Sequence, residues 1–338
     1  MSYEVELAPG GEIFEVAEGE TILDGALRAG IELQYGCRQG RCSTCKYLVE
    51  DGEVDFGSAS VYSLPDNERD DGWALLCCAT PETDLLIRDN RRHDERARPL
   101  LTPAETSASV VACSALTSEL WELRVALANP LDFYAGQYAE LTLDAGGTPV
   151  RRSYSMACAP AEGAELAFVL KRIEGGAFSS RVTALPAGAT LALRGPFGSS
   201  YLREGERPVL LVAIGSGIAP ILAMLRDAAA RGDRRHFSFF YGARRPADLP
   251  YVDELTALGN QLGSLRYVPT LDGLAEDDDW SGSTGTVTQA IQREIDSAED
   301  FDAYLCGAPE MCETVGRLLL AKGLPEHQLF FDRFFAAT

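Results

Sequence analysis

The sequence predicts three consecutive domains: a small α+β domain, an antiparallel β-barrel and an α/β domain with a doubly wound parallel sheet. A chain of 338 residues is too long for one ordinary hydrophobic core and favours two or three domains. The pattern of apolar residues also changes character twice along the chain. We therefore place the domains at residues 1–98, 99–203 and 204–338, with a linker at the end of the first.

The first domain is expected to combine strands with one helix. Two alternating segments flank a Pro-Gly-Gly turn, which is the pattern of a β-hairpin. A helix is predicted from Ile22, because apolar residues recur there at helical spacing, Thr21 stands at the N-cap position and Gly30 is a natural stop. The charged run 90–99 is interpreted as the linker. The predicted strands are residues 2–8, 12–18, 46–54 and 84–89.

The second and third domains differ in how their strands are connected. Short strand-like runs separated by turn signals predict the barrel; they are residues 107–116, 120–127, 138–143, 166–173 and 190–195. After residue 204, apolar strands alternate with helical stretches, which is the βαβ pattern of a parallel sheet. Those strands are residues 208–214, 236–242, 265–270 and 302–308, and the helices are 219–232, 251–260, 285–295 and 310–323.

Charge and composition exclude several classes of protein. The formal net charge of −21 disfavours nucleic acid as a partner, because a polyanion would be repelled. The apolar run 209–225 is too short and too broken by Gly and Pro to span a membrane comfortably. The acidic first twenty residues lack the apolar core of a secretory signal, so we expect a cytoplasmic protein. In that reducing compartment, clustered cysteines indicate metal or redox chemistry.

Three cysteines stand within nine residues, with the spacing Cys37-x4-Cys42-x2-Cys45. This is the ligand spacing of plant-type [2Fe–2S] clusters, which take a fourth cysteine from further along the chain. Cys77 is the expected fourth ligand and Cys78 is the alternative; on an extended segment only one of two successive side chains would reach the cluster. Zinc is disfavoured because only one Cys-x2-Cys occurs, and a disulfide because of the compartment.

These residues carry a family resemblance. Residues 36–54, "GCRQGRCSTCKYLVEDGEV", together with 75–81, "LLCCATP", resemble the N-terminal ferredoxin domain of bacterial oxygenase reductases. The other two predicted domains are similar to the remaining parts of the same family, so the resemblance covers essentially the whole chain. It implies a β-grasp ferredoxin domain, an FAD-binding barrel and an NAD-binding domain.

The barrel carries an Arg-x-Tyr-Ser motif at Arg152, Tyr154 and Ser155, which resembles that of the ferredoxin–NADP reductase superfamily. The resemblance implies that the arginine pairs with the FAD pyrophosphate, the tyrosine packs on the flavin ring and the serine lies near flavin N5. A guanidinium fork suits phosphate and an aromatic ring suits a flat cofactor, although such a motif alone also fits a polar barrel strand. Gly175, Gly176 and Ser179 precede a helix-like segment that suits a pyrophosphate. Lys171 completes the expected FAD-binding set.

The third domain opens with Gly215, Gly217 and Pro220 between a strand and a helix. Glycines let the backbone approach a pyrophosphate, and the helix N-terminus faces its charge. The spacing resembles the GxGxxP form of the reductase superfamily. Arg244 and Arg245 follow the second strand, where arginine favours the 2′-phosphate of NADPH, but the surrounding residues resemble NADH-using reductases.

Ser155, Cys306 and Phe334 form the expected catalytic set. Cys306 lies in a Cys-Gly-x-Pro turn that resembles the family's turn near the nicotinamide, and Phe334 in the aromatic end resembles the ring that shields the flavin. Alternatively, Cys306 is a small apolar residue that only packs in the core, and Phe334 likewise only fills the core.

The resemblance implies an NADH-dependent reductase. A hydride from NADH reaches FAD, and single electrons then pass through the [2Fe–2S] cluster to the hydroxylase component of a separate oxygenase. We expect a soluble di-iron monooxygenase that hydroxylates alkanes or phenols. A Rieske dioxygenase or P450 system is the alternative acceptor. A redox- or zinc-dependent regulator without enzymatic activity is the alternative from another class.

Overall fold

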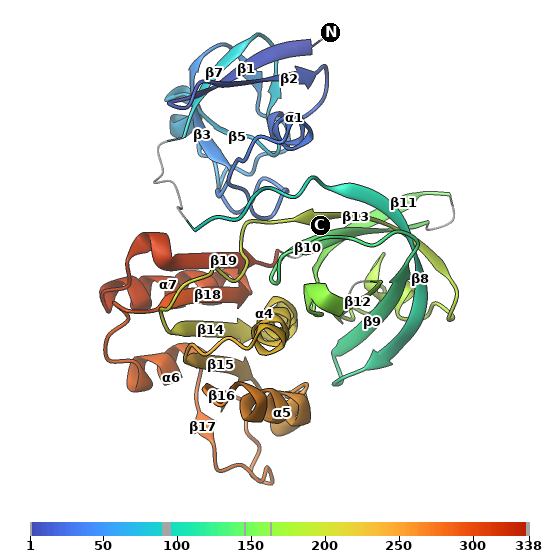
Figure 1. Cartoon of the computed structure of the whole chain (residues 1–338), viewed down its shortest axis with the longest axis vertical. Coiled ribbons are helices and arrows are strands. Elements are labelled where there is room, and N and C mark those ends of the chain that lie inside the picture. The colour runs from blue at the N-terminus through green and yellow to red at the C-terminus, as the bar shows by residue number, and fades with distance from the viewer. Residues whose placement is uncertain (1, 90–95, 145–146, 163, 336–338) are drawn as a thin grey trace. The chain divides into compact units, whose positions relative to one another are not determined.

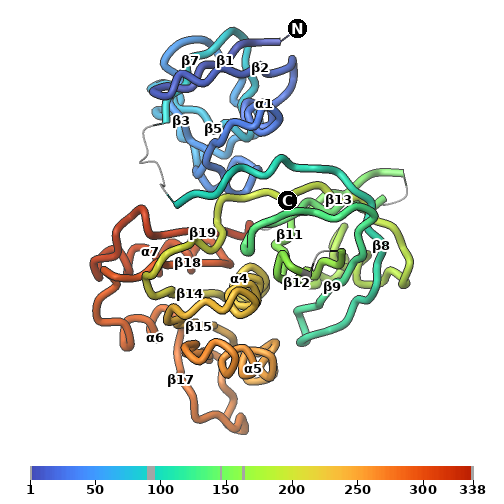
Figure 2. Tube along the Cα trace, viewed as in Figure 1, coloured from blue at the N-terminus to red at the C-terminus, as the bar shows by residue number. Residues whose placement is uncertain are grey.

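A computed structural model describes residues 2–89, 96–144, 147–162 and 164–335. The chain divides into two compact units, Met1–Pro103 and Ala104–Thr338, which are described one at a time (Figures 1 and 2). Most of the predicted linker falls on residues 90–95, which lie outside the described residues. The predicted boundary at residue 203 falls inside the second unit, so the division into three domains stays a prediction.

The first unit is a five-stranded mixed sheet with one long helix. The sheet has the order β2-β1-β7-β3-β5, in which β1 pairs antiparallel with β2 and parallel with β7. Helix α1 begins after Thr21, whose side chain accepts the Asp24 N–H, and ends at Gly30 in the left-handed conformation, as predicted. The elements are β1 (Ser2–Ala8), β2 (Glu12–Ala17), α1 (Ile22–Ala29), β3 (Lys46–Asp51), β4 (Val54–Asp55), α2 (Asp66–Asp70), β5 (Trp73–Leu75), β6 (Thr80–Pro81) and β7 (Leu85–Arg88).

The second unit begins with a six-stranded antiparallel sheet in the order β11-β10-β13-β8-β9-β12. An isolated antiparallel bridge between Met156 and Phe168 joins its two end strands, which closes the predicted barrel. The strands are β8 (Ala104–Ala115), β9 (Leu120–Leu127), β10 (Tyr138–Asp144), β11 (Pro149–Ser155), β12 (Glu165–Lys171) and β13 (Thr190–Phe197), with the short helices η1 (Pro160–Glu162) and α3 (Ser179–Val182).

The remainder of this unit is the predicted doubly wound parallel sheet, in the order β17-β16-β15-β14-β18-β19. Helices α4 and α5 cover one face, and α6 and α7 cover the other (Figure 1). The elements are β14 (Val209–Ile214), η2 (Gly215–Gly217), α4 (Ile218–Arg231), β15 (Phe237–Ala243), η3 (Pro246–Asp248), α5 (Val252–Leu262), β16 (Leu265–Leu271), β17 (Ser283–Thr284), α6 (Val287–Glu294), β18 (Asp302–Gly307), α7 (Pro309–Ala321), η4 (Glu326–Gln328) and β19 (Leu329–Arg333).

Two features of this sheet position the candidate site. The strand order reverses between β14 and β18, and ligands of such sheets bind beyond the carboxyl ends of the strands at that switch point. The aromatic end of the chain, which periodicity did not identify as a strand, forms β19 and pairs in parallel with β18.

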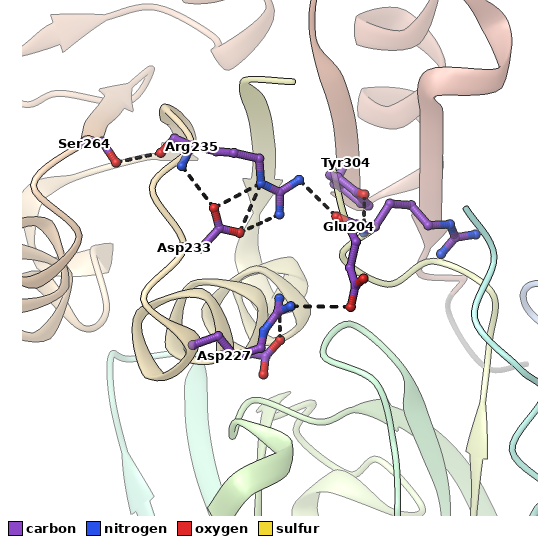
Figure 3. Close-up of polar contacts among 8 residues, drawn as sticks. Glu204, Asp227, Asp233, Arg235, Ser264 and Tyr304 are labelled. Atoms are coloured by element: carbon purple, nitrogen blue, oxygen red, sulfur yellow. Dashed lines mark hydrogen bonds and ion pairs between the residues drawn. The ribbon is translucent and has the colours of Figure 1, made fainter. Parts of the chain in front are cut away.

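The segment between β13 and β14 is fixed to the parallel sheet by polar contacts (Figure 3). The Arg203 N–H donates to the Tyr304 hydroxyl over 2.8 Å, and Arg235 Nη1 donates to the Arg203 carbonyl over 2.9 Å. Arg235 is itself held by the Asp233 carboxylate, with Nη2 2.6 Å from Oδ2. Residues of the barrel and of the parallel sheet also share one hydrophobic core. The barrel and the parallel sheet are thereby held together.

Candidate functional site

The cysteine loop brings its sulfur atoms together in two pairs. The Cys37 side chain hydrogen-bonds that of Cys42, and the Cys45 side chain hydrogen-bonds that of Cys77. The contact with Cys37 lowers the pKa of Cys42 to about 5, because the thiol of Cys37 donates to the sulfur of Cys42. Within the described residues, no group of three or more His, Cys, Asp or Glu is arranged to hold a metal ion. Two pairs of thiols nevertheless fit a binuclear cluster, in which each iron takes two protein ligands.

Backbone N–H groups point at these sulfurs. The Cys37 N–H donates to Cys42 Sγ, and the Gln39 N–H donates to Cys37 Sγ, each over 3.3 Å. Gly40 has φ +67°, and a Cβ there would stand 2.7 Å from Cys78 Sγ, so only glycine suits this position. Hydrogen bonds to cluster sulfurs are one of the ways in which a protein sets a reduction potential. The loop therefore has the donor set that an iron–sulfur cluster needs.

Cys77 and Cys78 do not point in opposite directions, so the prediction that only one of them can approach the other ligands was wrong. The segment is not extended, because the chain turns back after β5, with the N–H groups of Cys78 and Ala79 both bonded to the Leu75 carbonyl. As a result the sulfur atoms of Cys77 and Cys78 lie 3.7 Å apart. What distinguishes the two is their second contact, because Cys77 meets Cys45 whereas Cys78 accepts the Ser58 hydroxyl over 3.6 Å.

On the barrel, the Arg-x-Tyr-Ser motif lies in β11. Within the described residues, the Arg152 guanidinium makes one hydrogen bond, to the Arg151 carbonyl at 2.7 Å, so most of its five donors remain available for a phosphate. The Tyr154 ring packs 5.5 Å from the Phe178 ring, and burial raises its pKa to about 12, so the phenol stays protonated. Ser155 is 4% exposed. The arginine and tyrosine therefore fit an FAD site.

The glycine-containing turn of the barrel is shaped by Ser179. Its hydroxyl accepts the Ile173 N–H over 3.0 Å, so this side chain organises the turn and leaves the first backbone N–H groups of α3 to receive a ligand. A Cβ at Gly176 would stand 2.9 Å from the Ile173 carbonyl oxygen, whereas nothing lies within 4 Å of one at Gly175. Lys171, unlike the other residues of the expected FAD-binding set, forms a surface ion pair: its ammonium lies 2.7 Å from the Glu119 carboxylate.

The two glycines after β14 have different surroundings. A Cβ at Gly217 would stand 2.2 Å from the Cys306 carbonyl oxygen, so the turn packs directly on the end of β18. Gly215 has φ +54°, and nothing lies within 4 Å of a Cβ there. Pro220 is buried in the first turn of α4. Gly215 thus borders open space where the helix N-terminus would attract a pyrophosphate.

Three predicted catalytic residues meet beside the same switch point. The Ser155 hydroxyl, from the barrel, donates to Asp332 Oδ2 over 2.9 Å. Asp332 in β19 lies opposite Cys306 in the neighbouring strand β18. The Phe334 N–H donates to the Gly307 carbonyl over 2.8 Å. Cys306 is fully buried, and that burial raises its pKa well above its usual value. Sequence reasoning missed Asp332, although a lone acid among aromatic residues in "FFDRFF" was a signal.

At the end of β15, the two arginines differ. Arg244 is exposed, whereas Arg245 is paired with an acidic loop that follows β16. Its Nη2 lies 2.8 Å from Asp278 Oδ1 and 3.6 Å from Asp277 Oδ1, and its backbone N–H donates to Asp248. These carboxylates raise the Arg245 pKa, with Asp278 as the main cause. Asp278, 33 residues further along the chain, thus places a carboxylate beside Arg245 after the end of β15.

Comparison with known protein families agrees with each part of this geometry. Residues 5–82 match the 2Fe-2S iron-sulfur cluster binding domain, residues 108–201 the oxidoreductase FAD-binding domain, and residues 211–317 the oxidoreductase NAD-binding domain. The chain is therefore an NAD(P)H-dependent oxidoreductase that uses FAD and a [2Fe–2S] cluster.

Relatives specify the class further. The reductase component of phenol 2-monooxygenase from Pseudomonas sp. (strain CF600) is 36% identical, and the match covers 100% of this chain and 96% of the relative. The reductase component of propane 2-monooxygenase from Mycolicibacterium smegmatis is 35% identical, with 98% and 97% covered. The crystal structure of the Amycolatopsis cytochrome P450 reductase GcoB superposes with a TM-score of 0.87 at 29% identity over 98% of each chain. The chain belongs to the family of reductase components of bacterial multicomponent oxygenases, as its sequence predicted.

No helix in the described part of the chain has both the length and the apolar character needed to cross a membrane. None of the nine cysteines, all of which lie among the described residues, is in a disulfide.

Proposed function

We propose that this chain delivers electrons from NADH to the hydroxylase component of a soluble di-iron monooxygenase that acts on phenols or alkanes, in the cytoplasm. The observation that carries the proposal is the contact between Ser155 of the barrel and Asp332 at the carboxyl end of the parallel sheet. It supports a flavin site and a dinucleotide site that lie against each other. The named activities of the phenol and propane monooxygenase relatives support the choice of acceptor.

The residues described above have distinct proposed roles. Bound FAD would supply two-electron chemistry with NADH, and a bound cluster would supply single-electron transfer. Cys37 and Cys42 would hold one iron, and Cys45 and Cys77 would hold the other. The proposed FAD-binding residues are Arg152, Tyr154, Ser155, Lys171, Gly175, Gly176 and Ser179, and the proposed NADH-binding residues are Gly215, Gly217, Pro220 and Arg244.

The proposed catalytic residues position the reactants and exclude water. Asp332 fixes the Ser155 hydroxyl, so that this side chain has one orientation toward the flavin. Cys306 remains a neutral thiol, because burial opposes ionisation, and it adds no charge beside the nicotinamide. Phe334, whose backbone N–H is bonded to the Gly307 carbonyl, would shield the flavin ring from water.

Reconstitution tests the proposed acceptor. Purified protein is mixed with NADH and, one at a time, with the oxygenase components of phenol and propane monooxygenases, and the hydroxylated product is measured. Product from either supports the proposal. Turnover only with a P450 would show that a P450 is the acceptor, and the Amycolatopsis structure provides a precedent for that. Turnover only with a Rieske dioxygenase would show that the dioxygenase is the acceptor. A colourless protein that contains zinc and does not oxidise NADH would instead indicate a regulator.

Replacing Arg152 with alanine is expected to weaken FAD binding by about 10- to 100-fold, because hydrogen bonds to a charged phosphate are lost. The measurement is the FAD-to-protein ratio after dialysis. Arg151→Ala is the matched control, since Arg151 is the adjacent residue of the same strand, points to the opposite face and is 57% exposed. Equal FAD retention in the two variants would contradict the assignment of Arg152.

We further propose that the acidic loop after β16 makes NADH the preferred reductant. Asp277 and Asp278 neutralise Arg245 and would repel the additional phosphate of NADPH. Asp278→Asn is expected to raise the ratio of kcat/KM for NADPH to that for NADH by about tenfold, because Arg245 becomes free to pair with the phosphate. Asp279→Asn removes the same charge without touching the Arg245 ion pair and serves as the control. A ratio unchanged in Asp278→Asn, or a wild type that prefers NADPH, would contradict this proposal.

A further inference from the structure

Two apolar side chains stand in solvent beside the cysteine loop. Tyr62 is 95% exposed and Val61 is 56% exposed. Their segment is tied to the cysteine loop by hydrogen bonds, in which Ser63 Oγ donates to the Arg41 carbonyl over 2.7 Å and Ser43 Oγ donates to the Ser63 carbonyl over 2.9 Å. Tyr62 therefore rests on a segment with a fixed position relative to the proposed iron ligands.

The helix that follows, α2, carries exposed negative charge. Its one cation, Arg69, donates to the carbonyls of Leu64 and Ala59, and Glu68 is paired with Lys46 of β3. The remaining acids of this segment, Asp66, Asp70 and Asp71, are exposed. The segment that follows Tyr62 therefore exposes three carboxylates, and its one cation, Arg69, is only partly exposed.

This combination has the composition of a protein-binding surface. Tyrosine is enriched among the few residues that dominate binding energy, and a charged rim guides the encounter and fixes orientation. The negative rim would repel a nucleic acid or an anionic membrane surface. The partner that fits is a protein with an apolar pocket bordered by basic residues.

We propose that Val61, Tyr62, Asp66, Asp70 and Asp71, here called the Tyr62 patch, form the surface on which the oxygenase component docks to receive electrons. The inference rests on the proposed function, since it names the docking site for the acceptor proposed there. The fixed segment between Tyr62 and the cysteine loop explains why this surface serves electron exit: a partner seated on Tyr62 lies beside the proposed cluster.

Tyr62→Ala tests the proposal, with Ile13→Ala as the matched control. Ile13 is also an exposed apolar residue, 57% exposed, but it lies in β2 at the opposite edge of the sheet from β5, which leads to Cys77. The acceptors are the phenol monooxygenase oxygenase component and cytochrome c, a small basic protein that takes one electron per haem. We expect Tyr62→Ala to raise the KM for both acceptors by about tenfold and Ile13→Ala to leave it unchanged. NADH-dependent reduction of a small flavin-reactive dye stays unchanged in both variants.

The charged rim is tested by Asp66→Asn, Asp70→Asn and Asp71→Asn combined. The triple variant should lose most of the salt dependence of cytochrome c reduction, because fewer ion pairs form on docking. The proposal is overturned if Tyr62→Ala behaves like Ile13→Ala with both acceptors. It is also overturned if Tyr62→Ala slows reduction of the cluster by NADH with no acceptor present, because the patch would then serve the chain's own flavin module. Failure of the wild type to reduce any acceptor protein would instead contradict the proposed function itself.

Discussion

Replacing Cys42 with serine is expected to stop electron delivery to cytochrome c while NADH oxidation by a small flavin-reactive dye continues. Cys42 is 6% exposed, and its sulfur accepts hydrogen bonds from both the N–H and the thiol of Cys37. Its sulfur is therefore one of the two that form the first ligand pair. Without that thiolate the iron–sulfur site loses a ligand and its charge balance. The dye draws electrons from the flavin and does not need the cluster.

Cys78→Ser is the matched control for this experiment. Cys78 is also buried and lies 3.7 Å from Cys77, but its other contact is Ser58. We expect Cys78→Ser to retain the visible absorption of the cluster and the cytochrome c activity. Loss of the cluster in Cys78→Ser, with retention in Cys77→Ser, would assign Cys78 as the fourth ligand. Full cytochrome c activity in Cys42→Ser would show that the cluster is not on the electron path.

Gly217→Ala is expected to lower both the stability of the protein and its affinity for NADH. An added Cβ would stand 2.2 Å from the Cys306 carbonyl oxygen and 2.6 Å from its carbonyl carbon. These are backbone atoms, so the methyl group must push the turn after β14 away from the end of β18. Overpacking of this kind costs about 1–3 kcal/mol. The expected result is a lower midpoint of chemical unfolding, followed by circular dichroism, together with a raised KM for NADH.

Gly215→Ala is the companion variant, because an added Cβ there strains the backbone without clashing with another atom. Nothing lies within 4 Å of a Cβ at Gly215, but its φ of +54° disfavours alanine by about 1–2 kcal/mol. We therefore expect a smaller loss of stability than in Gly217→Ala, combined with weaker NADH binding because the methyl group enters the open space beside the helix N-terminus. If Gly217→Ala were as stable as wild type, the close packing of this turn on Cys306 would be refuted.

Local patterns predicted much of this protein. The hairpin, the capping of α1 by Thr21 and Gly30, and the glycine turn before α4 all depend on neighbours within a few residues, and the structure shows each of them. The spacing of Cys37, Cys42 and Cys45 likewise predicted the iron–sulfur domain that family comparison confirms.

Long-range contacts could not be predicted in the same way. Asp278 neutralises Arg245 across 33 residues, and Ser155 meets Asp332 across 177, so no local pattern contains either pair. The reversal of the chain after Leu75 depends on hydrogen bonds that periodicity does not encode, and it placed Cys78 beside Cys77 against expectation. Strand β19 was missed because its pairing with β18 is set by the sheet and not by an alternating pattern.

Anaerobic titration of the purified protein with NADH, followed by electron paramagnetic resonance, tests the central claim most directly. The claim is that electrons enter at the dinucleotide site and reach iron held by four thiolates. The account predicts that the flavin absorption bleaches and that the signal of a reduced [2Fe–2S] cluster appears. Bleaching of the flavin with no such signal, in protein that contains iron and acid-labile sulfide, would contradict it.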